Sequence, residues 1–117
     1  MEPTASSDVP VSVGGMQAHV TSISPNQFFT CGVQSGGAKC WGYNYYGELG
    51  DGSRTNRDHP TQVVGLTSGV VKISADSYSA CAVLTTEEAT CWGDNSAGDL
   101  GNDATTQSDI PVKVLLI

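Results

Sequence analysis

The sequence contains an internal repeat, and this feature restricts the possible folds more than any single motif. The stretch from Cys40 to Gly52 returns between Cys91 and Asp103. Its Cys, Trp, Gly, Asn, Gly, Leu and Gly residues recur in the same order 51 positions later, which is hard to obtain by chance. Units that repeat with a period of 20 to 50 residues bury their hydrophobic faces against neighbouring copies. We therefore expect a stack of similar units.

The similarity extends on both sides of this stretch. Upstream residues return 50 positions later: Pro10, Val13, Gly15, Ile23, Ser24, Cys31 and Val33 are equivalent to Pro60, Val63, Gly65, Ile73, Ser74, Cys81 and Val83. A third copy begins at Pro111, and the run from Ser7 to Val13 resembles the run from Ser108 to Val114. We divide the chain into the end of a preceding unit or linker (1–9), a first repeat or blade (10–59), a second (60–110) and the first strand of a third (111–117).

Each repeat has the pattern of four short β-strands. Runs rich in β-branched and aromatic residues predict strands at 11–13, 20–24, 28–33 and 38–41 in the first repeat and at 62–64, 70–74, 78–84 and 89–92 in the second. No segment has the 3.6-residue period and the caps of a helix. Short strands in units of about 50 residues favour the blades of a β-propeller, although a β-sandwich also has short strands.

The repeated residues resemble those of a known family. The pattern Val-x-x-Ile-Ser, then Cys-x-Val, then Cys-Trp-Gly-x-Asn-x-x-Gly-x-Leu-Gly is similar to the repeat of the regulator of chromosome condensation family, and its cysteines resemble copies in large bacterial extracellular proteins. The resemblance implies an all-β fold with two four-stranded antiparallel propeller blades plus the first strand of a third, in an incomplete or oligomeric ring. Members include a nucleotide-exchange factor, a plant ultraviolet receptor and a β-lactamase inhibitor, but none of their functional residues can be matched here.

Each repeat contains one pair of cysteines, Cys31 with Cys40 and Cys81 with Cys91. A two-residue turn in the first hairpin and a three-residue turn in the second place the members of each pair opposite one another. Cross-strand Cβ atoms lie close to the separation of a disulfide, so two disulfides within hairpins are expected. Reduced buried thiols are the alternative, and zinc is disfavoured because no Cys-x₂₋₄-Cys knuckle is present.

Disulfides would place the protein in an oxidising compartment, and we expect an extracellular or cell-surface location. The first residues lack the basic and apolar regions of a signal peptide. The chain is therefore expected to be an excerpt of a longer secreted protein that starts at an added Met1.

Several residues are expected to serve the scaffold because both repeats keep them. The tryptophans are expected to pack between neighbouring blades. The asparagine that follows each Trp-Gly pair is expected to bond to backbone groups in a turn. These scaffold residues are Trp41, Gly42 and Asn44 in the first repeat and Trp92, Gly93 and Asn95 in the second.

Surface positions that differ between the repeats are candidates for recognition. Tyr43, Tyr45 and Tyr46 in the first repeat stand where the second has Asp94, Ser96 and Ala97. Tyrosine gives a large contact area at low entropic cost, so these residues form a candidate partner-binding patch, to which Phe28 and Phe29 belong if they share that rim. The alternative is that these rings only cover the neighbouring blade.

Composition and motifs argue against several other functions. The net charge of −7 and five scattered Lys and Arg residues disfavour nucleic acid, and no apolar run approaches the ~20 residues of a membrane span. We find no catalytic residue set and expect no enzyme, cofactor or metal; the acidic loop from Asp94 to Asp103 lacks the residue order of a calcium-binding EF-hand.

The sequence thus predicts a non-catalytic propeller repeat unit that serves as a protein-interaction or scaffold module of an extracellular protein. Two blades do not close a ring of roughly four to eight. The partners are therefore further blades of a parent chain, copies of this chain in a shared ring that accept the strand 111–117, or an unidentified protein. A carbohydrate-binding propeller is a weaker alternative, because no residue set supports it.

Overall fold

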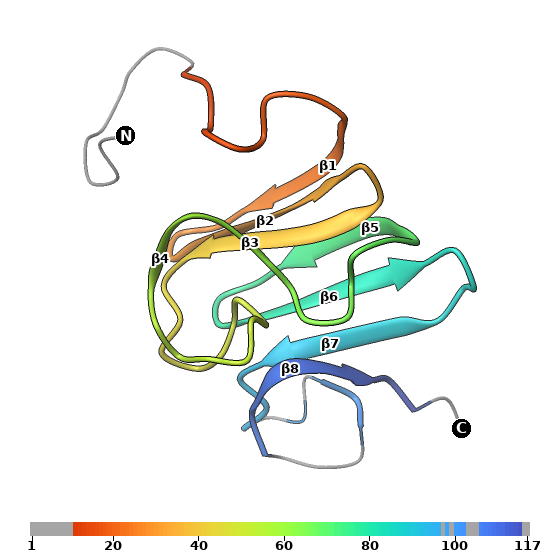
Figure 1. Ribbon diagram of the computed structural model, residues 1–117. Coiled ribbons are helices and arrows are strands. Elements are labelled where there is room, and N and C mark those ends of the chain that lie inside the picture. The colour runs from red at the N-terminus through yellow and green to blue at the C-terminus, as the bar shows by residue number, and fades with distance from the viewer. Residues whose placement is uncertain (1–10, 97, 99, 103–105, 116–117) are drawn as a thin grey trace.

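The computed structural model describes residues 11–96, 98, 100–102 and 106–115, which form two four-stranded antiparallel β-sheets (Figure 1). Sheet 1 contains, in spatial order, β1 (Val20–Pro25), β2 (Phe29–Gln34), β3 (Gly37–Gly42) and β4 (Arg57–Gln62). Sheet 2 contains β5 (Val70–Ala75), β6 (Ser79–Leu84), β7 (Ala89–Gly93) and β8 (Ser108–Lys113). The all-β prediction is confirmed, and no helix in the described ranges is long and apolar enough to cross a membrane.

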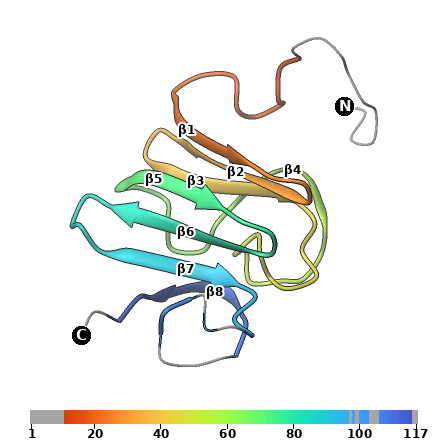
Figure 2. The same cartoon turned by 180° about the vertical axis from the view of Figure 1, so that it is seen from behind.

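The two sheets stack on one another, with β5 beside sheet 1 in the front and back views (Figures 1 and 2). The hydrophobic core lies between them. β2 contributes Val33, which is 0% exposed, and β5 contributes Ile73, which is 3% exposed. Alternation explains the pattern in β2, because Phe29, Cys31 and Val33 point to the same face of the sheet. In β5 the register shift between Val70 and Lys72 interrupts the alternation, so that the two buried residues, Val70 and Ile73, are three positions apart.

The sheets are offset from the sequence repeats, which corrects the predicted blade boundaries. β4 pairs with β3 in sheet 1, with Gln62 opposite Lys39, and β8 pairs with β7, with Lys113 opposite Thr90. The predicted boundary between residues 59 and 60 therefore passes through β4. The first strand of each sequence repeat closes the sheet of the repeat before it.

One further strand prediction is wrong, and another strand is present but already paired. Residues 11–13 do not form a strand, and no sheet among the described residues precedes them to pair with. The segment 111–117 was expected to begin a third unit and to be free for donation to a neighbour. Instead, residues 111–113 are the end of β8 and complete sheet 2, whereas residues 116 and 117 lie outside the described residues.

Both predicted disulfides are present. Cys31 lies opposite Cys40 and Cys81 opposite Cys91, with Sγ–Sγ distances of 2.08 and 2.06 Å. The first hairpin turns at Ser35 and Gly36, which both have positive φ angles of 51° and 80°, as a two-residue type I′ turn requires. Turn length therefore fixes the register that brings the sulfur atoms together.

The two equivalent tryptophans have different environments. Trp92 is fully buried, its Nε1 donates to the Glu48 carbonyl oxygen at 2.9 Å, and its ring lies against Gly50, where an added Cβ would come within 2.8 Å of Trp92 Cδ1. Trp41 is only half-buried. The loop of the first unit covers Trp92, whereas no unit among the described residues covers Trp41 in the same way.

Candidate protein-interaction surface

The long β3–β4 loop is held by one buried asparagine. Asn44 is 0% exposed, and its Nδ2 donates to the carbonyl oxygens of Ser53 and Thr55 at 3.1 and 2.9 Å. Its Oδ1 accepts from the Leu49 N–H at 3.0 Å. These bonds fix the loop around a central side chain and satisfy backbone groups that a loop otherwise leaves unpaired.

Asn95 has the same role in the second unit. It is also 0% exposed, its Oδ1 accepts from the Leu100 N–H at 3.0 Å and its Nδ2 donates to the Thr106 carbonyl oxygen at 3.1 Å. In both units the buried asparagine thus holds the described part of the loop, while the outward-pointing positions differ in sequence.

An ion pair braces the first loop. Arg57 Nε lies 2.9 Å from Asp51 Oδ2. Burial alone would raise the pKa of Asp51, but hydrogen bonds from Ser53, Arg57 and Asn44 outweigh it and hold that pKa below its ordinary value of 3.8.

Two glycines bring the loops against the preceding turns. Gly42 has φ +114°, and an added Cβ would lie 2.8 Å from the Phe28 carbonyl oxygen. Gly93 has φ +102°, and an added Cβ there would likewise meet the Tyr78 carbonyl oxygen. The residue after each glycine therefore bonds to the turn: the Tyr43 N–H donates to the Phe28 carbonyl oxygen at 3.0 Å.

This geometry gathers five aromatic rings at one end of the sheets. We call them the aromatic cluster: Phe28, Tyr43, Tyr45, Tyr46 and Tyr78. The ring centroids of Phe28 and Tyr78 are 5.1 Å apart, those of Tyr46 and Tyr78 4.7 Å and those of Tyr45 and Tyr46 5.0 Å. Tyr45 is 62% exposed, so the cluster presents an aromatic surface to solvent.

The structure corrects one predicted member of this surface and adds another. Phe29 is 2% exposed and belongs to the core, because neighbouring residues at the start of β2 point to opposite sides. Tyr78 joins the cluster although it was not selected from the sequence. It stands 50 positions after Phe28, so an aromatic residue at the same place in both repeats was the available signal.

A buried carboxyl group lies beside the cluster. Glu48 is 0% exposed; its Oε1 accepts from the Tyr46 N–H at 2.7 Å, and its Oε2 has no hydrogen-bond partner among the residues that the structure describes. Burial raises the pKa of Glu48 above its ordinary value of 4.5; the N–H groups of Glu48 and Tyr46 oppose this shift, and Asp94 adds to it. Burial and the neighbouring tyrosines likewise raise the pKa of Tyr46.

Glu48 predicts a pH dependence of stability above its ordinary pKa. Because its folded-state pKa is raised, its stabilising contribution is complete below pH 4.5 and is lost as the pH rises through the folded-state pKa. We expect the thermal midpoint to fall as the pH rises above 4.5, and Glu48→Gln to flatten this fall and to stabilise the protein at the alkaline end of the range by about 1 kcal/mol. Calorimetry across this range measures both effects.

The control for this experiment is Glu87→Gln, which changes an exposed glutamate of the β6–β7 turn. The lowered pKa of Asp51 acts in a separate window, since its contribution is lost only as the pH falls below 3.8. A thermal midpoint that falls equally in the wild type and in Glu48→Gln would contradict the assignment to Glu48.

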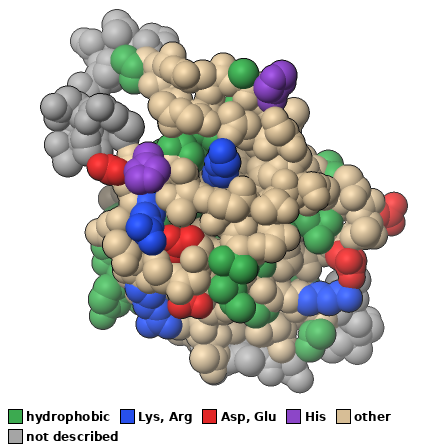
Figure 3. All heavy atoms as spheres, viewed as in Figure 1, with side chains coloured by type: hydrophobic (Ala, Val, Ile, Leu, Met, Phe, Trp, Pro, Cys, Tyr) green, Lys and Arg blue, Asp and Glu red, His purple; other side chains and the backbone are tan. Residues whose placement is uncertain are grey.

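Charged side chains of both signs are interspersed on the face seen in Figure 3. Two of the basic residues pair with acids, Arg57 with Asp51 and Lys113 with Glu88. In the described ranges, no three His, Cys, Asp or Glu side chains lie close enough together to hold a metal ion. Asp99 and Asp103 of the acidic loop lie outside those ranges.

The comparisons with known proteins match parts of this chain. Residues 35–83 match the family model of the Regulator of chromosome condensation (RCC1) repeat. The chain therefore carries an RCC1 repeat. It is 34% identical over 87 residues to the human E3 ubiquitin-protein ligase HERC2, covering 74% of this chain and 2% of the ligase. It is 28% identical over 109 residues to the Arabidopsis thaliana ultraviolet-B receptor UVR8, covering 90% of this chain and 25% of the receptor.

Solved structures share the fold of this RCC1-repeat chain. Human WBSCR16 superposes with a TM-score of 0.76 at 21% identity, over 91% of this chain and 28% of that protein. Prp20p from Saccharomyces cerevisiae superposes with a TM-score of 0.73 at 16% identity, over 92% and 27%. The two sheets are therefore propeller blades of the RCC1 type. Because the chain spans about a quarter or less of these proteins, their activities are not transferred to it.

Proposed function

We propose that this chain is a non-catalytic RCC1-repeat module that binds another protein through the aromatic cluster. The observation that carries this proposal is the exposure of an aromatic surface that the scaffold does not require. The second unit builds the same loop around Asn95 with Asp94 and Ser96 where the first has Tyr43 and Tyr45. Exposed tyrosines on such a loop give contact area with little loss of side-chain entropy.

The relatives support an interaction role in general terms. Yeast RCC1 (Prp20) has been crystallised bound to Kap60, and the structure of Prp20p is described together with its binding to Gsp1p and histones. Those partners belong to those proteins. The two disulfides are compatible with an extracellular location, and we propose that this module works there, as a binding or scaffold part of a longer protein.

Substitution of Tyr45 tests the aromatic surface. A phage-displayed peptide library is selected on the wild-type chain, and enriched peptides are measured by fluorescence polarisation. We expect Tyr45→Ala to weaken binding at least about tenfold, because central aromatic residues carry most of the energy of an interface. Tyr45→Phe keeps the ring and is expected to retain most of the affinity.

Val71→Ala is the matched control, because Val71 is 54% exposed on β5 and is not part of the aromatic cluster. Peptides that bind Tyr45→Ala as tightly as the wild type, while the variant keeps its thermal midpoint, would refute the aromatic cluster as the binding surface.

A second proposed role is that of one unit in a longer array or ring of blades. It is favoured by residues that are buried between the sheets in one unit and exposed in the other. Ile73 is 3% exposed, whereas its equivalent Ile23 is 53% exposed on the outer side of sheet 1. Each outer face of this pair of sheets thus has the composition of an interface, and the neighbour is either a further repeat or a copy of the chain.

A further inference from the structure

The packing of sheet 2 on sheet 1 defines how one sheet holds the first strand of the next sheet. Two hydrogen bonds connect β5 to the end of β1. The Ala75 N–H donates to Ser24 Oγ at 2.9 Å, and Asn26 Nδ2 donates to the Asp76 carbonyl oxygen. Sheet 1 therefore supplies one side-chain acceptor, Ser24 Oγ, and one side-chain donor, Asn26 Nδ2. The segment at the end of β5 supplies the matching backbone N–H and backbone carbonyl oxygen.

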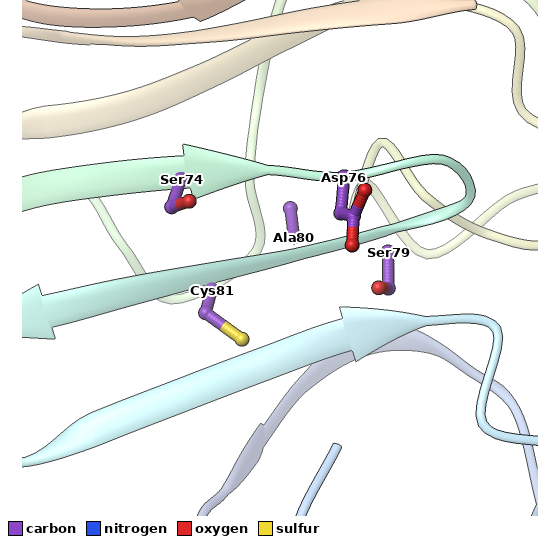
Figure 4. A pocket seen from close by; sticks show the side chains of 5 residues that line it. All are labelled: Ser74, Asp76, Ser79, Ala80 and Cys81. Carbon is purple, nitrogen blue, oxygen red and sulfur yellow. The ribbon is translucent and has the colours of Figure 1, made fainter. Parts of the chain in front are cut away.

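The equivalent surface of sheet 2 is uncovered. Its Val83 is 44% exposed, whereas Val33 at the same place in sheet 1 is 0% exposed. An open pocket on this surface is lined by Ser74, Asp76, Ser79, Ala80 and Cys81 (Figure 4). Ser74 and Asp76 occupy the places of Ser24 and Asn26. We call this pocket the strand seat, because its counterpart in sheet 1 lies where β5 is bound.

The strand seat keeps the backbone geometry of its counterpart. The Asn26 N–H donates to the carbonyl oxygen three residues later at 3.0 Å, and the Asp76 N–H does the same at 2.8 Å. The two turns therefore share this backbone hydrogen bond, but their side chains have different partners. Asn26 Oδ1 accepts from the N–H groups of Phe28 and Phe29, whereas Asp76 Oδ1 accepts from the Ser77 N–H. The chemistry also differs, since a carboxylate stands where sheet 1 has an amide.

A second copy of this chain does not complement the strand seat. Its β1 would take the place of β5, with Pro25 at the position of Ala75. Proline has no N–H, so Ser74 Oγ would receive no hydrogen bond. An ionised Asp76 only accepts hydrogen bonds, and it would face the Asn26 carbonyl oxygen of the second copy. Both connecting bonds are lost, and one becomes a contact between two acceptors.

We propose that the strand seat binds the first strand of the next sheet in a further RCC1 repeat, a strand that has a backbone N–H at the position of Ala75 and a hydrogen-bond donor facing Asp76, and that it rejects a second copy of this chain. The inference rests on the proposed role as one unit of an array and specifies the neighbour. Apolar packing does not distinguish a second copy from another repeat, because the exposed Ile23 of a second copy could pack on the seat as Ile73 packs on sheet 1. The polar groups that a second copy would leave unpaired make the distinction.

Self-association of designed variants tests the proposal. Sedimentation velocity and native mass spectrometry are applied to the wild type, Pro25→Ala, Asp76→Asn and the double variant. The double variant restores both bonds between copies, so we expect it to associate at least about tenfold more tightly than the wild type. Asp58→Asn removes the same charge from an exposed position on β4 and is expected to behave as the wild type.

Each result decides the proposal. If the wild type associates as tightly as the double variant, the proposed rejection of a second copy is wrong. If the double variant stays monomeric, the proposal that the strand seat binds a strand is wrong. The mirror substitutions Asn26→Asp and Ala75→Pro remove the same bonds inside the chain, and we expect them to lower its thermal midpoint. These measurements do not involve the peptides selected on Tyr45, so failure of the aromatic surface remains distinguishable from failure of the seat.

Discussion

Trp92→Ala is expected to lower the free energy of unfolding by about 3–5 kcal/mol. The indole is fully buried between the units, so its removal leaves a cavity against Gly50. It also removes the donor to the Glu48 carbonyl oxygen, which is then buried without that bond. Since small domains are stable by only about 5–15 kcal/mol, this loss would unfold a large share of the molecules at moderate urea concentrations.

Trp41→Ala is the matched control, because Trp41 holds the same place in the first repeat but is only half-buried. We expect a clearly smaller loss in urea titrations followed by circular dichroism. Equal losses in the two variants would contradict the stacking of sheet 2 on sheet 1 as the source of the effect. They would indicate instead that both tryptophans are covered, as in an assembly of several chains.

Removal of the first disulfide is the second large expected effect. The Cys31→Ala and Cys40→Ala double variant is expected to lose about 2–3 kcal/mol from the increased chain entropy of the unfolded state. A cavity adds to this loss, because both cysteines are 0% exposed and lie in the core between the sheets. Alanine is preferred to serine for this test, since a buried hydroxyl would need a hydrogen-bond partner.

The second disulfide provides the comparison. Cys81 lies on the uncovered face of sheet 2 and is only half-buried, whereas Cys91 is 3% exposed. The loop that this disulfide closes has nearly the same length, so the entropic contributions are alike and the cavity is smaller. We therefore expect the Cys81→Ala and Cys91→Ala variant to lose less in urea titrations. Equal unfolding midpoints for wild type with and without reductant would contradict both expectations.

The sequence predicted local features of the fold well because their causes are local. Turn length fixes the register of a hairpin, so the pairing of Cys31 with Cys40 follows from the residues between them. Comparison of the two repeats likewise identified Asn44, which both repeats keep, as a scaffold residue and Tyr45, which differs between them, as a candidate for recognition. These predictions require only the sequence close to the residues concerned and the period of the repeat.

Features that depend on distant partners were predicted poorly. The run around Gln62 has the pattern of a strand. Nothing in the nearby sequence indicates that it pairs with β3, which precedes it in the chain, rather than with β5, which follows it. Tyr78 joins the aromatic cluster only because two units lie side by side. Phe29 was misplaced because the face of β2 that meets sheet 2 cannot be chosen until the stacking is known.

The offset between sheet and sequence repeat has a consequence for growth by gene duplication. A copied 50-residue segment brings its own opening strand, and that strand finishes the sheet already present, as β8 does for sheet 2. A further segment added at the C-terminal side would likewise need the opening strand of the segment after it to complete its sheet. A protein of this kind can be extended one segment at a time where the polar groups at each joint match.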